Sequence, residues 1–203
     1  MQWFVLGGPM MWPLLLVSIL SAAIIIERLF FYSACAFPVR NLDELLADSL
    51  RSGDPRAVLE QMEKVKLLRP FCAATRETVL DRETALRLAA GRIIDKAGVG
   101  LGVLGMLGRI APLLGLLGTI IGIMLTFSRI ASTHGAVDMP LLAGGIWQAL
   151  ITTAAGLIIA VPAVFARHFF LRRRQNISRG LEDVGNTVLA LEKTACGGED
   201  HHA

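Results

Sequence analysis

The chain has 203 residues, of which 54% are hydrophobic, and its mean hydropathy is +0.57. Its formal net charge is +3 at pH 7, and its three cysteines, Cys35, Cys72 and Cys196, lie far apart without a CxxC pair or a histidine at zinc-like spacing. Because the apolar residues stand in long blocks, the composition excludes an ordinary soluble domain, and the cysteine pattern argues against a disulfide framework or a structural metal.

The first apolar block lies at the N-terminus. Residues Met1 to Ile26 carry no charge, and 11–32 is long enough to cross a bilayer as a helix. A secretory signal peptide has positive charge before its apolar run, whereas here the first charges, Glu27 and Arg28, follow it. We therefore predict a retained first span with residues 1–10 outside. Glu27 and Arg28 are interpreted as membrane-boundary anchors, with an ion pair between them as the alternative.

Residues 33–108 form a charged insertion after the first span. Apolar residues at helical spacing predict two short helices, one over 41–50 and one over 57–68. The break between them places Asp54 as a helix cap and Pro55 at a first helical position.

The second half of the insertion has a different pattern. From Phe71 to Gly98, charged and apolar faces alternate with no strong helix breaker, which predicts one long amphipathic helix. A dense run of glycines follows, and either close packing or a bend in the helix accounts for it. These glycines are Gly98, Gly100, Gly102, Gly105 and Gly108.

The second and third spans are predicted over 109–130 and 140–166, joined by a short loop over 131–139. The runs Ile110 to Ser128 and Met139 to Ala166, which cover most of these spans, contain no ionisable side chain. Each run is long enough to cross a hydrocarbon core of about 30 Å as a helix. The sequence therefore predicts a membrane hairpin.

Each helix of the hairpin has one face of small residues, where other backbones come close, and a remaining surface of large apolar side chains. On the first helix the small residues, with one adjoining threonine, are Gly108, Ala111, Gly115, Gly118, Thr119, Gly122 and Thr126. On the second helix they are Gly145, Ala149, Thr152, Thr153, Gly156, Ala160 and Ala163.

The basic residues predict the orientation. Nineteen of the twenty Lys and Arg residues fall on one side of this layout, and Arg129 falls on the other. The positive-inside rule assigns the first side to the cytoplasm, which places the insertion and the C-terminal helix and tail, 167–203, inside. Arg109 and Arg167 then mark the inner ends of the second and third spans, where we interpret them as further anchors. This topology accounts for the basic residues, so the positive net charge does not require binding to nucleic acid.

The chemistry available in the spans is polar but uncharged. A proton channel usually exposes an ionisable group near the midplane. The runs Ile110 to Ser128 and Met139 to Ala166 contain none, so if this chain conducts protons, a partner must supply that group. The nucleophile elbow, phosphate loop and HExxH motifs are missing, so the sequence indicates neither an enzyme nor a bound cofactor. A threonine hydroxyl can order water or bond to a carboxylate; alternatively, it bonds to a carbonyl of its own helix and the side chain only packs. The polar, uncharged side chains in the two runs are those of Thr119, Thr126, Gln148, Thr152 and Thr153.

Two stretches resemble a known family. APLLGLLGTIIGIMLTF and GGIWQALITTAAGLIIAVPAV are similar to the ExbB/TolQ/MotA family of proton-channel subunits, and three spans with one insertion are similar to its ExbB and TolQ branches. The resemblance implies an all-α membrane protein in the bacterial inner membrane, multi-pass, with a periplasmic N-terminus and a cytoplasmic C-terminus. It implies a homo-oligomeric ring, commonly a pentamer, around two single-span helices of the ExbD/TolR type, whose membrane aspartate takes and releases the proton.

Carried onto this chain, the resemblance places the family's paired pore threonines at Thr119 and Thr153. Where many relatives have glutamate in GIxEAL, this chain has Gln148, which leaves a hydrogen-bonding role in place of a relay. The further positions expected along the proton path are Gly115, Gly122, Ala149 and Gly156.

The resemblance also implies a function. We expect a subunit of a motor driven by the proton-motive force that energises outer-membrane uptake through a TonB-like protein. One alternative is a TolQ-like subunit that maintains the envelope through a TolA-like protein, and another is a scaffold that conducts no protons. Neither a metal nor a cofactor is expected.

Overall fold

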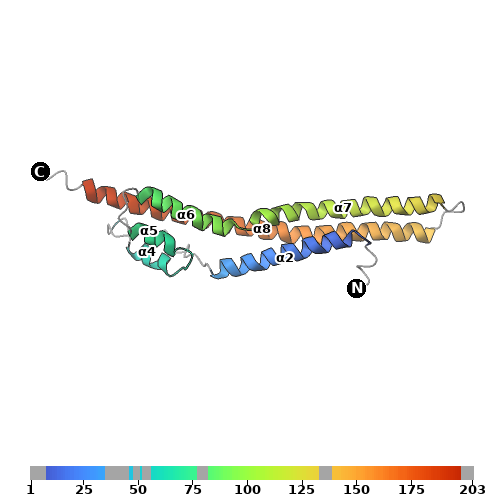
Figure 1. Ribbon diagram of the computed structural model, residues 1–203, viewed down its shortest axis with the longest axis horizontal. Helices are drawn as coiled ribbons and strands as arrows, with labels where there is room; N and C mark the ends of the chain where they lie inside the picture. Colours follow the sequence, from blue (N-terminus) through green and yellow to red (C-terminus); the bar gives the residue numbers. More distant parts are fainter. Residues whose placement is uncertain are drawn as a thin grey trace. The chain divides into compact units, whose positions relative to one another are not determined.

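Helices form the architecture of the chain. The computed structural model describes residues 8–34, 46–47, 51, 56–76, 82–132 and 139–197. Within these ranges, three helical stretches are long and apolar enough to cross a membrane, which confirms the predicted class. The elements are α2 (Met11–Ala34), α4 (Arg56–Glu63), α5 (Arg69–Arg76), α6 (Arg82–Gly98), α7 (Leu101–Ser132) and α8 (Met139–Gly197), shown in Figure 1.

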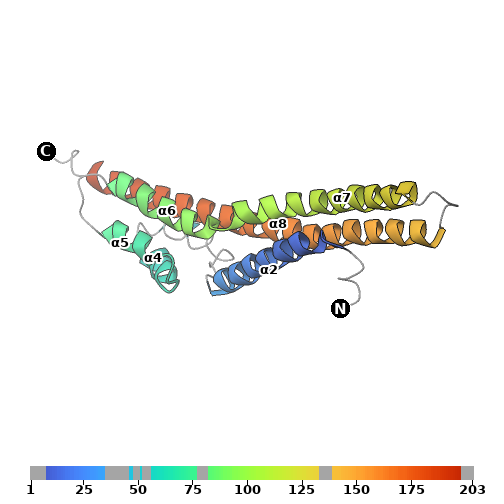
Figure 2. The same cartoon turned by 45° about the vertical axis from the view of Figure 1, so that its right-hand side comes forward.

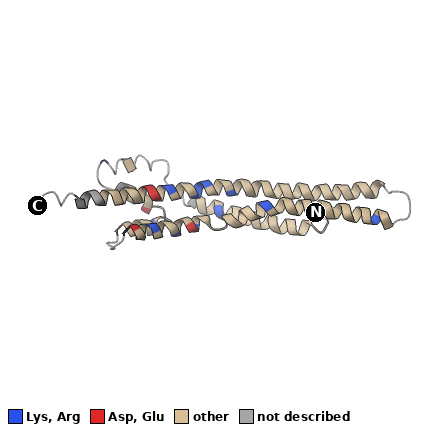
Figure 3. Cartoon of the chain, turned by 90° about the horizontal axis from the view of Figure 1, so that it is seen from above, with Lys and Arg blue, Asp and Glu red and all other residues tan. Residues whose placement is uncertain are grey.

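The chain divides into two units, and α2 and α8 contribute to both, whereas α7 lies within the first. The first unit holds Met1–Arg28 and Gly100–Phe169, and the second holds Leu29–Val99 and Phe170–Ala203. Figure 3 shows few charged positions along the parts of α7 and α8 that belong to the first unit. The apolar spans and the charged insertion therefore belong largely to different units.

In the first unit, α7 and the first half of α8 lie side by side (Figures 1 and 2). The small-residue faces predicted from the sequence are buried in this pair, as at Ala111 and Ala163, which are both 0% exposed. Large apolar side chains such as Met124 and Phe165 point outward. Val17 of α2 packs against Ala111 and Ala160 in a small apolar cluster. The predicted division of each helix into a packed face and an outer face is confirmed.

The second unit has an ordinary hydrophobic core. It is formed by α4, α5, α6 and the part of α8 that belongs to this unit, whose buried residues recur at helical spacing. The fully enclosed side chains include Met62, Phe71, Ile93, Leu181 and Val184. The tail after the third span is therefore a helix with a buried face, as its pattern predicts, and α8 is continuous across Pro162 and across the predicted boundary at residue 166.

The prediction of one helix from Phe71 to Gly98 is wrong. Phe71 and Ala90 line the same cavity, although a continuous helix would hold their Cα atoms about 28 Å apart. α5 and α6 are therefore two separate helices that pack together. Their shared core buries Phe71, Leu86 and Ile93 away from water.

Two other helix predictions for the insertion have different outcomes. The helix predicted over 57–68 ends at Glu63, and turns lead from there to α5. The helix predicted over 41–50 lies outside the described residues except for 46–47, and Asp54 and Pro55 lie outside them as well.

The glycine run before the second span serves two purposes. Gly100 has φ +76°, a left-handed conformation that favours glycine, and it separates α6 from α7. Gly108 instead packs against α8, since a Cβ atom there would lie 3.0 Å from Val164 Cγ2. Close packing, one of the two explanations left open by the sequence, occurs at Gly108. In place of the bend that was the other explanation, the helix breaks at Gly100.

Side chains from α2 and α8 satisfy the last turn of α6. The Tyr32 hydroxyl donates a hydrogen bond to the Ala97 carbonyl at 2.8 Å, and Arg174 Nε donates to the Ile94 carbonyl at 3.2 Å. The Tyr32 ring stacks on Phe170 with centroids 5.3 Å apart. Since carbonyls in the last turn have no partner within the helix, these bonds fix where α6 ends.

We expect Tyr32→Phe to lower the free energy of unfolding by about 1 kcal/mol, because it removes this hydrogen bond and keeps the stacking. Denaturant unfolding of the purified protein in detergent would measure the change. Ser33→Ala is the matched control, since the Ser33 hydroxyl is exposed and bonds to Phe30 within its own helix. Equal stability of the two variants would contradict this assignment.

Candidate functional site

The α7 and α8 backbones touch along a line of glycines, here called the seam. A Cβ atom on Gly156 would lie 2.6 Å from the Ala111 carbonyl oxygen and 3.2 Å from Gly115 Cα. A Cβ atom on Gly115 would lie 3.0 Å from the Thr152 carbonyl oxygen. Contacts this short leave no room for a side chain, so glycine at both positions is what allows the helices to pair.

The seam continues toward the α7–α8 connection. A Cβ atom on Gly118 would lie 2.7 Å from Thr152 Oγ1, and one on Gly122 would lie 3.4 Å from Ala149 Cβ. Four of the predicted path residues therefore pack between the two helices of this chain, and their contact with a proton path in a ring stays a prediction. These four residues are Gly115, Gly122, Ala149 and Gly156.

Thr153 and Thr119 lie about one helical turn apart along the seam. Thr153 Oγ1 donates a hydrogen bond across the helix pair to the Gly115 carbonyl at 3.2 Å. In an α-helix this carbonyl faces the amide of the residue four positions on, which here is Thr119. Thr119 Oγ1 donates to the Leu116 carbonyl at 2.6 Å. Both side chains are partly exposed, so each oxygen can still accept a hydrogen bond from water or a protonated carboxyl.

Thr152 and Thr126 have a different environment. They are 1% and 7% exposed, and their hydroxyls donate to carbonyls of their own helices, Thr152 to Ala149 at 2.7 Å and Thr126 to Gly122 at 2.8 Å. The packing interpretation fits these two threonines. Periodicity alone groups all four hydroxyls together, whereas their exposure separates them.

Gln148 lies against the turn that begins α2. A Cβ atom on Gly8, which has φ +69°, would overlap Gln148 Nε2. The amide side chain therefore packs against backbone of its own chain. A neutral side chain suits this position, because a charged carboxylate would lose more hydration on packing there.

The four boundary residues differ in their surroundings. Arg28 contacts the Glu27 carboxylate through Nε at 2.6 Å and Nη2 at 2.5 Å, with its own side chain 5% exposed. The ion pair considered as an alternative is therefore formed. Arg109 is exposed, whereas Arg167 Nε is buried without a hydrogen-bond partner among the described residues. Anchoring in the membrane stays a prediction for all four.

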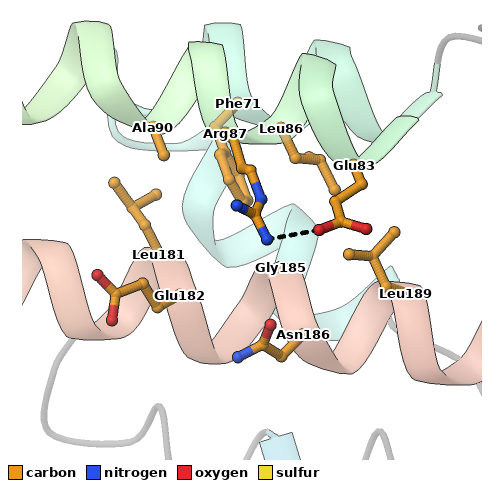
Figure 4. Close-up of a pocket in the computed structure, with 10 residues that line it drawn as sticks. All are labelled: Phe71, Glu83, Leu86, Arg87, Ala90, Leu181, Glu182, Gly185, Asn186 and Leu189. Atoms are coloured by element: carbon orange, nitrogen blue, oxygen red, sulfur yellow. Dashed lines mark hydrogen bonds and ion pairs between the residues drawn. The ribbon is translucent and has the colours of Figure 1, made fainter. Parts of the chain in front are cut away.

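The second unit has a cavity of about 340 Å³ between α5, α6 and α8 (Figure 4). Its lining includes the ion pair between Arg87 Nη2 and Glu83 Oε1 at 2.5 Å, together with Glu182 and Asn186. The lining residues include no serine, cysteine or histidine that could act as a nucleophile or base with them. Across the described ranges, no group of three His, Cys, Asp or Glu side chains is placed to hold a metal ion.

Comparison with known proteins agrees with the resemblance at the seam. Residues 52–183 match the MotA/TolQ/ExbB proton channel family. The chain is 34% identical to biopolymer transport protein exbB1 of Vibrio cholerae over 173 residues, which cover 77% of this chain and 72% of that protein. It is 40% identical to biopolymer transport protein ExbB of Salmonella typhimurium over 113 residues, 56% of this chain and 43% of that protein. With ExbB of Pseudomonas putida the identity is 38%, covering 57% of this chain and 34% of that protein.

Proposed function

The chain belongs to the MotA/TolQ/ExbB proton channel family, and on that premise we propose that it forms the ring of an inner-membrane motor driven by the proton-motive force. It is a multi-pass membrane protein with an ExbB-like channel domain. In the proposed assembly several copies, five in the arrangement implied by the family, surround two single-span helices of the ExbD/TolR type.

One observation carries the proposal. The seam holds two partly exposed hydroxyls, on Thr119 and Thr153, within the runs Ile110 to Ser128 and Met139 to Ala166, which contain no ionisable side chain. Such a surface can order water and bond a carboxyl group, but it cannot itself take up or release a proton. The proposal therefore assigns the titrating group to an aspartate in the partner's membrane helix.

The proposed mechanism couples each proton to one small step. The partner's carboxylate is charged before it takes a proton and neutral afterwards. The charged form is more stable beside the hydroxyls of the seam, whereas the neutral form tolerates apolar surroundings, so each proton transfer changes which position is preferred. Each proton crossing 100 mV releases about 2.3 kcal/mol, which limits the work of one step and requires many repeated steps.

The proposed topology follows the charges. Residues 11–32, 109–130 and 140–166 cross the membrane, with 33–108 and 167–203 in the cytoplasm. The support is the distribution of basic residues, of which only Arg129 falls on the periplasmic side.

The output is proposed to be transport rather than envelope maintenance. The relatives described above are named for biopolymer transport, which favours energising a TonB-like protein over a TolA-like one. Deleting the gene is expected to abolish nutrient uptake that depends on the TonB-like protein while leaving the outer membrane intact. Leakage of periplasmic proteins with normal uptake would favour the TolQ-like alternative.

Proton flux tests the channel itself. Liposomes that contain this chain and its single-span partner are expected to acidify under an imposed membrane potential, whereas liposomes with either protein alone are not. A pH-sensitive dye inside the liposomes would report the flux. Absence of flux in every combination would favour the scaffold alternative.

A further inference from the structure

Two arginines at the ends of the apolar runs line a small cavity in the first unit. Its volume is about 310 Å³, and it lies between α7 and α8. Arg109 comes directly before the uncharged run that begins at Ile110, and Arg167 comes directly after the run that ends at Ala166. The cavity is lined by Gly102, Gly105, Met106, Arg109, Ile110 and Arg167.

The Arg167 side chain is held in this cavity by the shape of α7. A Cβ atom on Gly105 would overlap Arg167 Nε and lie 2.7 Å from its Cδ. Glycine at this position therefore lets the guanidinium group lie flat against the α7 backbone. A Cβ atom on Gly102 would meet nothing within 4 Å, so the space beside the guanidinium stays open.

The charge of the cavity is unbalanced. Both ionisable residues that line it are arginines, and no acidic residue lines it. Arg167 Nε is buried and lacks a hydrogen-bond partner among the residues that the structure describes. A buried N–H group of a cation is costly to leave unpaired, so the site calls for an anionic acceptor.

The remaining lining identifies the kind of anion. Met106 and Ile110 add apolar side chains to the lining, and Ile110 is the first residue of the uncharged run. A phosphodiester with adjoining acyl chains matches this combination of two guanidinium groups and neighbouring apolar side chains. Guanidinium groups bind phosphate oxygens in pairs of parallel hydrogen bonds, with greater specificity than a lysine would provide.

We propose that this cavity is a phospholipid site in which Arg109 and Arg167 hold the headgroup phosphate and Met106 and Ile110 contact the start of an acyl chain. The site requires only that α7 and α8 cross the bilayer, and it is independent of proton conduction. Its failure would therefore leave the proposed channel function in place.

Native mass spectrometry of the delipidated full-length protein with dioleoylphosphatidylglycerol tests the proposal. The double variant Arg109→Gln/Arg167→Gln is expected to weaken lipid retention about tenfold or more, because it removes the charged hydrogen bonds to phosphate. Arg172→Gln/Arg173→Gln is the matched control, since it removes the same number of charges from exposed positions outside the cavity. Equal loss in the control, or no loss in the double variant, would overturn the proposal.

Three further samples separate the whole phospholipid from its parts and test the described geometry of the cavity. Dioleoylglycerol, which has the acyl chains without phosphate, and inorganic phosphate, which has no chains, are both expected to bind much more weakly than the phospholipid. Equal binding of either one would overturn the assignment. Gly105→Ala keeps both charges but displaces the Arg167 side chain, and it is expected to weaken retention as well. Full retention in Gly105→Ala would contradict the described geometry.

Discussion

Replacing Thr119 with valine is expected to lower proton flux about ten- to a hundredfold, the equivalent of one hydrogen bond to a charged group, while the protein still assembles with its partner. Valine has nearly the same volume as threonine but no hydroxyl, so the variant removes a hydrogen-bonding oxygen from the seam and changes little else. The Thr119 bond to Leu116 lies within one helix, and its loss should therefore leave the pairing of α7 and α8 intact. Flux into liposomes and co-purification with the partner would be measured together.

Thr126→Val is the matched control for this experiment. The Thr126 hydroxyl also bonds to a carbonyl of α7, at 2.8 Å, but its side chain is 7% exposed and lies inside the seam. The proposed path does not reach it, so flux should stay near the unsubstituted level. Equal flux in all three proteins would contradict the role of Thr119 and favour the scaffold hypothesis, whereas equal losses in both variants would indicate general damage to the helix pair.

Gly156→Ala is expected to destabilise the helix pair by about 1–3 kcal/mol through overpacking. The added methyl group would lie 2.6 Å from the Ala111 carbonyl oxygen. The atom it meets belongs to backbone, which cannot move aside as a flexible side chain can. Unfolding of the purified protein in mixed detergent micelles would measure the loss, and the size of the complex would report whether ring assembly depends on the seam.

Gly144→Ala controls for the change in helix propensity. Gly144 lies in the same helix, and a Cβ atom there would meet nothing within 4 Å. Both variants gain the preference of alanine for a helix, so the difference between them isolates the contact at the seam. If Gly156→Ala were as stable as Gly144→Ala, the close approach of the two backbones would be wrong.

The membrane part of the fold could be predicted from the sequence because its constraints are local. Long runs without charge give the spans, and small residues at helical spacing give the face of each helix that packs. Gly115 and Gly156 were both expected on such faces, and the structure brings their Cα atoms into the same contact. A short loop joins the second and third spans, so the sequence also indicates that their small-residue faces pack against each other.

The second unit was harder to predict because the packing of α5 against α6 depends on tertiary contacts. Nothing between Phe71 and Gly98 breaks a helix strongly, yet the structure has α5 and α6 packed together in one core. The gain comes from burying apolar faces against α8, whose residues lie about a hundred positions further along the chain. A pattern confined to one segment does not report that gain.

At the candidate site the residue types could be predicted from the sequence, but their environments could not. Thr152 and Thr153 are neighbours in sequence, but Thr152 is 1% exposed while Thr153 bonds across the seam. Arg167 was expected as an anchor, and nothing in the sequence indicated that its side chain rests on Gly105. The hydrogen bond from Tyr32 to Ala97 was likewise missed. Each of these depends on distances between helices, which periodicity does not supply.

The most direct test of the central claim is proton flux in liposomes that contain this chain and a partner whose membrane aspartate is changed to asparagine. The account predicts that this substitution abolishes flux while the complex still forms, because the spans Ile110 to Ser128 and Met139 to Ala166 contain no group that can replace the carboxylate. Undiminished flux with the asparagine variant, or equal flux from this chain alone, would contradict the claim that the titrating group lies in the partner.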